Sequence, residues 1–461
     1  MQPLFSRAGA QAILRPRTVA ERNVRAVLVD GIGVGIATGV GSFLAIFLVR
    51  LGASGLLIGL LTSLPALTGA LLAVPIGRFL ERQRNIVPWY SGMRVWVLWS
   101  YALFGLLPFV LPLAWVPWAV ILIWALVTVP STFVNVAFTV VMGGVAGPRH
   151  RFALMSLRWS SLGAVTAITV ALVGLLLDRG KASFPLNYQL VFIASFVGGL
   201  LSYLFSRTIA LPDNPPLEQG AAEPAPVASG GVTPRAFAVV RSFSRLFAIQ
   251  NRPLALVHDL RAAPLPFRRF VASAFVFRGG VAMAIPLLPL YWAREVGASD
   301  AWIGIITTAN SAVLLVAYFI WSAAARKIGV GGVLIATSFG MACYPLAVAS
   351  TSSVVMLAVL AGMVGFFSAG NDLVNFDLVL SSIPAEHQAT YVGLYQTLQN
   401  AALFLMPLVG TLLAGWIGVP GALVAAGVLR LVGAGLYLAL GIGRSTPEQL
   451  APDSAQQRRN P

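Results

Sequence analysis

Twelve apolar stretches, each long enough to cross a lipid bilayer, dominate the sequence. A spanning helix needs about 20 mostly apolar residues. The stretches lie at 27–50, 55–77, 86–107, 113–141, 153–177, 187–207, 269–292, 301–324, 331–350, 353–381, 389–416 and 418–443. Only 10% of the residues are charged and 58% are hydrophobic, whereas soluble domains carry roughly 25% charged residues. We therefore predict an all-α membrane protein with 12 transmembrane helices.

One short motif occurs twice and divides the chain in two. Residues 51–61 read LGASGLLIGLL, and residues 296–306, which lie 245 positions later, read VGASDAWIGII. A repeat at about half the chain length indicates two similar halves in tandem. Paired halves of a membrane protein usually hold a binding site between them. We predict one six-helix bundle at 27–208 and a second at 269–443.

The basic residues indicate how the chain is oriented. The net charge is +16, almost all of it from arginine, and short cytoplasmic loops collect Arg and Lys. Basic residues gather before the first stretch and after the second, fourth, eighth and twelfth. We therefore expect the ends, 1–26 and 444–461, to be cytoplasmic in a multi-pass protein of the plasma (inner) membrane. This orientation explains the arginines better than nucleic-acid binding does.

A hydrophilic insert at 209–268 separates the two halves. Its first part, 212–234, is rich in Pro, Ala and Gly, which favours a flexible cytoplasmic linker. Its second part, 235–250, reads RAFAVVRSFSRLFAIQ and alternates arginine with Phe and Leu. That pattern fits an amphipathic helix on the inner membrane surface, and it fits a solvated connector equally well.

The loop after the second stretch carries a family pattern. The pattern is Gly, three residues, an acid, a basic residue, one residue and Gly. Residues 77–84 read GRFLERQR, with Arg84 in place of the second Gly, and residues 322–329 repeat the basic end as SAAARKIG. With two sets of six helices and a long central loop, the chain resembles the major facilitator superfamily over roughly residues 27–443. The resemblance implies a secondary transporter that works by alternating access.

The same loops imply a conformational latch. An acidic residue at one helix end can pair with an arginine or a helix N-terminus of a neighbouring helix, and the bond can break in another state. The candidates are Gly77, Glu81 and Arg82 after the second stretch, and Arg326 and Lys327 after the eighth. The alternative is that these basic residues only anchor the loops to anionic lipid.

Polar residues gather on spans that, by the resemblance, pack at the centre or line the cavity. Polar side chains that face lipid are costly, so these should face protein or water. The tenth span carries four of them at i, i+3, i+4 and i+7, which places them on one helical face. The candidates for a substrate cavity are Thr132, Asn135, Trp159, Asn310, Ser368, Asn371, Asn375, Gln396, Gln399 and Asn400.

Two ionisable residues lie inside apolar stretches of the second half. Arg278 belongs to the seventh stretch and Asp372 to the tenth. Because an unpaired charge in hydrocarbon costs several kcal/mol or more, we expect the two to pair. Arg278 would be a cavity cation and Asp372 a partner that loads and releases a proton. A permanent structural pair fits the same residues.

Two further aspartates are candidates for coupling or for latching. Asp30 begins the first stretch, and Asp377 lies on another face of the tenth, nearer the cytoplasm. Arg94 and Arg158 lie close to the cytoplasmic ends of their stretches, so we expect them to extend toward the membrane surface.

The sequence thus predicts a secondary transporter of a small solute, with a proton as a candidate coupling ion and the monomer as the working unit. It predicts no cofactor and no metal, because His150, His258 and His387 are scattered in loops, and no ATP-binding phosphate loop is present in the sequence. Two alternatives are a polytopic membrane enzyme acting on lipid and a transporter-like sensor or scaffold. The first would need an acidic or histidine cluster at one membrane face, and the second has no need of polar stripes.

Overall fold

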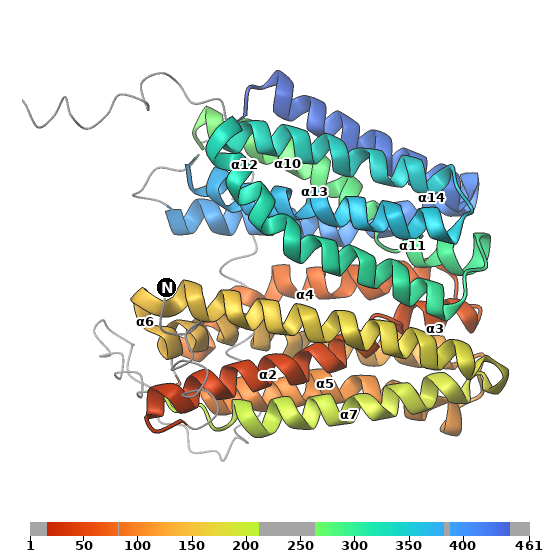
Figure 1. Cartoon of the computed structure of the whole chain (residues 1–461), viewed down its shortest axis with the longest axis horizontal. Helices are drawn as coiled ribbons and strands as arrows, with labels where there is room; N and C mark the ends of the chain where they lie inside the picture. The colour runs from red at the N-terminus through yellow and green to blue at the C-terminus, as the bar shows by residue number, and fades with distance from the viewer. Residues whose placement is uncertain (1–15, 82, 212–262, 382–387, 443–461) are drawn as a thin grey trace, which may run out of the picture. The chain divides into compact units, whose positions relative to one another are not determined.

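The computed structural model describes residues 16–81, 83–211, 263–381 and 388–442, and these are helical apart from short connections (Figure 1). The helices are α2 (Val19–Gly41), α3 (Leu44–Arg50), α4 (Gly55–Glu81), α5 (Val87–Val110), α6 (Val116–Arg179), η1 (Lys181–Ser183), α7 (Leu186–Ser206), α10 (Leu265–Ala284), α11 (Leu287–Leu290), η2 (Tyr291–Glu295), α12 (Asp300–Ala349), α13 (Val354–Ser381) and α14 (Gln388–Ala439). The predicted amphipathic helix at 235–250 lies outside the described residues.

In the described part of the chain, 10 segments are long and apolar enough to cross a membrane. Helix α6 supplies two of them, Val116–Phe138 and Leu157–Arg179. The spans within α12 and α14 have 50 and 46 residues, about twice the length that one crossing needs. Each of these two helices turns at a glycine with positive φ, Gly329 at 74° and Gly418 at 77°. If α12 and α14 each count as two crossings, the described part of the chain has 12 spans, as the hydropathy of the sequence predicts.

The chain divides into two compact units. Unit 1 comprises Met1–Asp259 and Trp292–Thr308, and unit 2 comprises Leu260–Tyr291 and Ala309–Pro461. The first residues of α12 therefore belong to unit 1, although most of that helix belongs to unit 2. Each unit is described by itself below.

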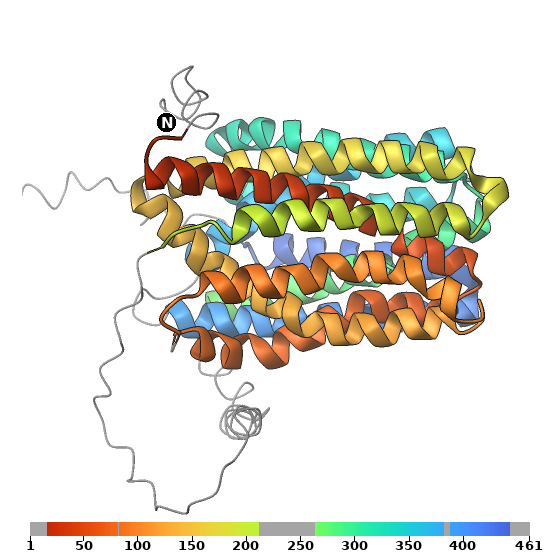
Figure 2. The same ribbon diagram turned by 90° about the horizontal axis from the view of Figure 1, so that it is seen from below.

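Close helix packing holds unit 1 together. Helix α2 packs along α6 and α7, and α5 packs along the same two helices; Figure 2 shows α2 and α7 side by side. A Cβ on Gly33 of α2 would lie 2.6 Å from the carbonyl oxygen of Gly198 in α7. Since that distance is shorter than any normal contact, the two backbones approach closely only because both residues lack a side chain.

The main contact of unit 2 is between α10 and α14. Phe270 and Phe277 of α10 lie beside the ring of Tyr437 in α14, with centroids 6.4 and 5.8 Å apart. A Cβ on Gly433 of α14 would lie 2.6 Å from the backbone nitrogen of Phe277. Small and aromatic residues thus alternate along this contact and bring the two helices together.

The repeated motif folds into the same kind of turn in both places. Gly52 and Gly297 both have positive φ, 82° and 64°, which glycine adopts without the steric cost that a Cβ brings. After α3, the amide of Ala53 donates to the carbonyl of Leu48 over 2.9 Å, as in a Schellman cap. Each copy therefore ends one membrane helix and starts the next.

Candidate functional site

A charged pair joins α10 and α13 inside unit 2. Nη2 of Arg278 donates to Oδ1 of Asp372 over 3.4 Å, and 29% of the Arg278 side chain and 45% of the Asp372 side chain are exposed. Tyr395 of α14 lies near Arg278. Both charges lie within apolar spanning segments, Leu265–Glu295 and Val354–Asn375. Charges at that depth face a bundle interior or a water-filled cavity rather than lipid.

The polar face predicted on α13 is divided between the bundle interior and the exposed side. Asn371 has no exposed surface and Asn375 is 5% exposed. Nδ2 of Asn371 donates to Oγ of Ser338 over 3.1 Å, and Nδ2 of Asn375 donates to Oδ1 of Asn371 over 2.7 Å. Both asparagines are therefore closed off from solvent in this conformation, and their place in a substrate cavity stays a prediction. Asn371 thus bonds to Ser338 across the α12–α13 contact and accepts from Asn375. Within the described residues, Oδ1 of Asn375 is buried and accepts no hydrogen bond.

The other predicted cavity residues fall into three groups. Thr132 and Gln399 are buried, so they too are not open to a solute in this conformation. Asn310, Ser368 and Asn400 are half-buried, and Nδ2 of Asn310 donates to the carbonyl of Ala361 over 3.1 Å. The residues that do present an exposed side chain are Asn135, Trp159 and Gln396.

A second charged cluster is buried within unit 1. Asp30 of α2 has no exposed surface. It accepts from Nη1 of Arg94 in α5 at 3.1 Å and from Nη2 of Arg158 in α6 at 3.2 Å. It also accepts from Oγ of Ser202 in α7 at 2.6 Å and from the hydroxyl of Tyr90 at 3.2 Å. One carboxylate thus joins four helices.

The expectation that Arg94 and Arg158 extend to the membrane surface is wrong. They are 5% and 2% exposed, and each turns inward to Asp30. The guanidinium of Arg158 also lies 4.6 Å from the ring centre of Phe138, which is a favourable cation–π distance. The physical reason is the buried carboxylate, which would be left without a countercharge if the arginines turned outward.

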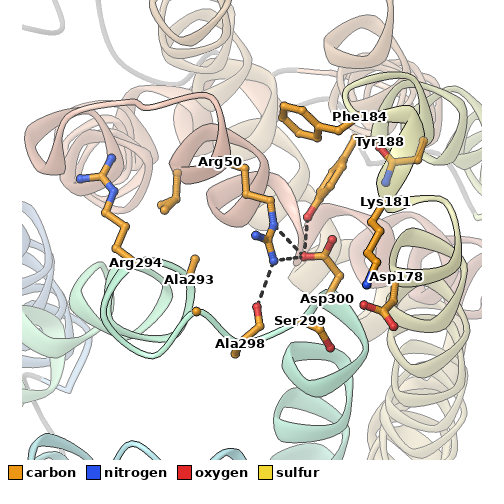
Figure 3. Close-up of a pocket in the computed structure, with 13 residues that line it drawn as sticks. Arg50, Asp178, Lys181, Phe184, Tyr188, Ala293, Arg294, Ala298, Ser299 and Asp300 are labelled. Carbon is orange, nitrogen blue, oxygen red and sulfur yellow. Dashed lines mark hydrogen bonds and ion pairs between the residues drawn. The ribbon is translucent and has the colours of Figure 1, made fainter.

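A third charged cluster lies at the opposite end of unit 1 (Figure 3). Asp300, the first residue of α12, accepts at Oδ1 from Nε and Nη2 of Arg50 at 2.9 and 2.8 Å. The hydroxyl of Tyr188 donates to the same oxygen over 2.7 Å. Nη2 of Arg50 also donates to the carbonyl of Ala298 over 3.0 Å. The cluster borders a cavity of about 510 Å³ that Asp178, Lys181 and Arg294 also line.

Comparison with known proteins identifies the architecture. Residues 270–461 match the family model described as Major Facilitator Superfamily. The structure of the nucleoside transporter NupG aligns with a TM-score of 0.63 at 12% identity, covering 92% of this chain and 99% of that one. The family match covers the second half of the chain, and the structural likeness shows that the whole chain has the fold of these transporters.

Two further solved transporters share the fold of this chain. A bacterial homologue of the human lysosomal transporter Spinster, in an inward-facing and unoccupied conformation, aligns with a TM-score of 0.61 at 16% identity and covers 92% of this chain and 97% of its own. The peptide transporter POT in complex with sulfate aligns with a TM-score of 0.65 at 14% identity and covers 91% of this chain and 95% of its own. No curated protein sequence matches the chain.

The predicted latch is only partly described. Gly77 lies within α4, and Glu81 is the last residue of that helix, while Arg82 lies outside the described residues. Arg326 and Lys327 are exposed on α12, three and two residues before the turn at Gly329. The role of these residues, like that of Asp377 on α13, stays a prediction.

Sequence reasoning missed the cluster at Asp300. One signal was available, because Asp300 directly follows the second GAS motif where the first copy has Gly55, and Arg50 precedes the first copy by one residue. The second copy has Glu295 where the first has Arg50, and Asp300 where the first has Gly55, so the charges break the internal symmetry of the repeat. The sequence does not show that Tyr188 of α7 lies beside these residues and donates the third hydrogen bond to Asp300.

Proposed function

We propose that this protein moves a small solute across the plasma (inner) membrane by alternating access, and that Arg278 and Asp372 contact the solute. The observation that carries the proposal is a pair of opposite charges that stays partly exposed inside apolar spanning helices. Charges held at membrane depth are expensive and mark solute or ion pathways.

The geometry of the pair suits exchange with a solute better than it suits a structural role. The Arg278–Asp372 contact measures 3.4 Å, whereas charge-assisted hydrogen bonds are usually about 2.7–2.9 Å. The bonds that hold Asp30 and Asp300 are shorter, and those two aspartates are buried. Replacing one partner of a long, exposed ion pair by a solute group costs less interaction energy than replacing one partner of a short, buried pair.

Proton coupling follows as a finer part of the proposal. A solute anion that binds Arg278 takes away the countercharge of Asp372. A carboxylate left without a countercharge in a poorly solvated site binds a proton more readily. Solute and proton would then load together, and both would leave when the pair forms again.

Binding by the detergent-purified full chain is the first test. A panel of small solutes, with nucleosides and short peptides among them because the structural neighbours are named for these, is screened for a rise in Tm. Binding to the folded state alone raises stability by RT ln(1 + [L]/Kd). We expect Arg278→Gln and Asp372→Asn to lose the rise for the best solute.

The matched control is Arg207→Gln, which removes an exposed arginine at the end of α7. We expect it to keep the rise in Tm. If the two site variants respond to the solute as the unchanged protein does, Arg278 and Asp372 are not at the site. A sensor would bind the solute in the same way, and only a flux measurement separates it from a transporter.

A further inference from the structure

The cluster at Asp300 has the geometry of a carboxylate receptor. Three donors converge on one oxygen, two from the guanidinium of Arg50 at 2.9 and 2.8 Å and one from the hydroxyl of Tyr188 at 2.7 Å. They come from α3 and α7, while the carboxylate comes from α12. The chain's own aspartate therefore fills a site that the other two helices build.

The receptor opens onto a cavity that a small molecule can enter. The cavity measures about 510 Å³ and is bordered by Arg50, Tyr188 and Asp300 themselves, and 29% of the Arg50 side chain is exposed. Lys181 and Arg294 add positive charge at opposite sides of the view in Figure 3, and Asp178 adds one negative charge. Three cations against two carboxylates favour an anionic occupant.

Asp300 is held in place by the packing of α12 against α6. A Cβ on Gly174 of α6 would lie 2.7 Å from the carbonyl oxygen of Asp300. Further along, the hydroxyl of Thr308 donates to the carbonyl of Ala167 over 3.2 Å. A movement that separates these two backbones would also withdraw the Asp300 carboxylate from Arg50 and Tyr188.

We propose that Arg50 and Tyr188 form a carboxylate-binding site on the predicted outer side of the membrane. Asp300 occupies this site in the present conformation, and a carboxylate of a solute occupies it when α12 moves away. The reason is that a partly buried guanidinium left without its anion is strongly unfavourable. The site is distinct from Arg278 and Asp372, which lie in unit 2.

Chemical rescue tests the receptor without any knowledge of the transported solute. Asp300→Ala removes the internal carboxylate and leaves Arg50 and Tyr188 in place, as in the state where α12 has moved away. We expect a Tm several degrees below that of the unchanged full chain in detergent. Formate or acetate at tens of millimolar should restore a large part of that loss, and ethylammonium chloride at the same ionic strength should not.

Two controls make the result specific to the receptor. Asp178→Ala removes a carboxylate from the same cavity but not the one that Arg50 and Tyr188 bind, so formate should leave its Tm unchanged. Arg50→Ala combined with Asp300→Ala removes the guanidinium as well and should abolish the rescue. Equal effects of formate on Asp300→Ala and Asp178→Ala, or no effect on Asp300→Ala, would overturn the proposal.

A second variant covers the case in which Asp300→Ala does not fold. Asp300→Asn keeps the volume of the side chain and removes its charge, and the amide fills the space that formate would need. In a Cys343→Ser background with Ala167→Cys, whose side chain is 9% exposed in the unchanged protein, we expect Asp300→Asn to speed labelling by a membrane-impermeant thiol reagent several-fold. Unchanged labelling would show that Asp300 does not hold α12 at this contact, and the proposal would fail.

Discussion

At the scale of single residues, the buried aspartate of unit 1 differs from the exposed aspartate of unit 2. Asp30 has four side-chain donors and no exposed surface. Asp372 keeps 45% of its side chain exposed. Two aspartates in similar apolar stretches therefore have different environments. The helices packed around each one determine whether its carboxylate is buried or exposed.

We expect Asp30→Asn to be strongly destabilising. The change leaves Arg94 and Arg158 buried without a countercharge, and breaking a buried ion pair by removing one partner typically costs about 3–5 kcal/mol. Thermal unfolding of purified protein and the yield of monodisperse protein both report the loss. A Tm equal to that of the unchanged chain would mean that the arginines find other partners and that Asp30 does not join the four helices.

Asp372→Asn gives the opposite expectation at the same scale. Its partner Arg278 is partly exposed, so water can solvate the guanidinium after the change. We expect a stability change within about 1 kcal/mol, the usual range for a solvent-accessible ion pair, measured as a small shift in Tm. A loss as large as that of Asp30→Asn would make the pair structural.

At the scale of helices, close backbone approach makes two glycines irreplaceable. A Cβ on Gly33 would lie 2.6 Å from the carbonyl oxygen of Gly198, and a backbone atom cannot move aside as a side chain can. We expect Gly33→Ala to lower the Tm sharply. The control is Gly92→Ala on α5, where a Cβ would meet nothing within 4 Å and alanine should stabilise the helix by roughly 0.5–1 kcal/mol.

Hydropathy predicts the helices well because a bilayer leaves few other folds for an apolar chain. It also places the repeated turn, since Gly52 and Gly297 both take the conformation that ends a helix. Helical periodicity predicts the arrangement of the candidate site residues on α13 less well. It correctly puts Asn371 and Asp372 on nearby positions of α13, yet it does not show that the first faces Ser338 and the second the exposed side. That division depends on where α12 crosses α13, which no local pattern contains.

At the scale of the whole molecule, the charges inside the spanning helices do not balance. Among the described ion pairs, Arg94 and Arg158 share Asp30, and Arg278 pairs with Asp372. The hydrogen bonds described for Arg430 go to backbone carbonyls, so these four arginines exceed their carboxylate partners by two. Arg430 adds to this excess, because it is 3% exposed and donates to the carbonyls of Gly280 and Met341. Surplus positive charge in a low-dielectric interior attracts anions.

We therefore expect an anionic solute. In the thermal screen, each carboxylic acid is paired with its neutral amide and with an amine of similar shape. The acids should raise the Tm more than their amides, and the amines should have no effect. A cationic solute as the best ligand would contradict the charge argument while leaving the transporter fold untouched.

Flux through proteoliposomes tests the central claim most directly. The solute that stabilises the protein best is radiolabelled, and its uptake is followed with and without a pH gradient for the unchanged chain, Arg278→Gln, Asp372→Asn and the control Arg207→Gln. We expect uptake by the unchanged chain and the control to depend on the pH gradient, and we expect no uptake by Arg278→Gln or by Asp372→Asn. Full gradient-driven uptake by both site variants would contradict the account.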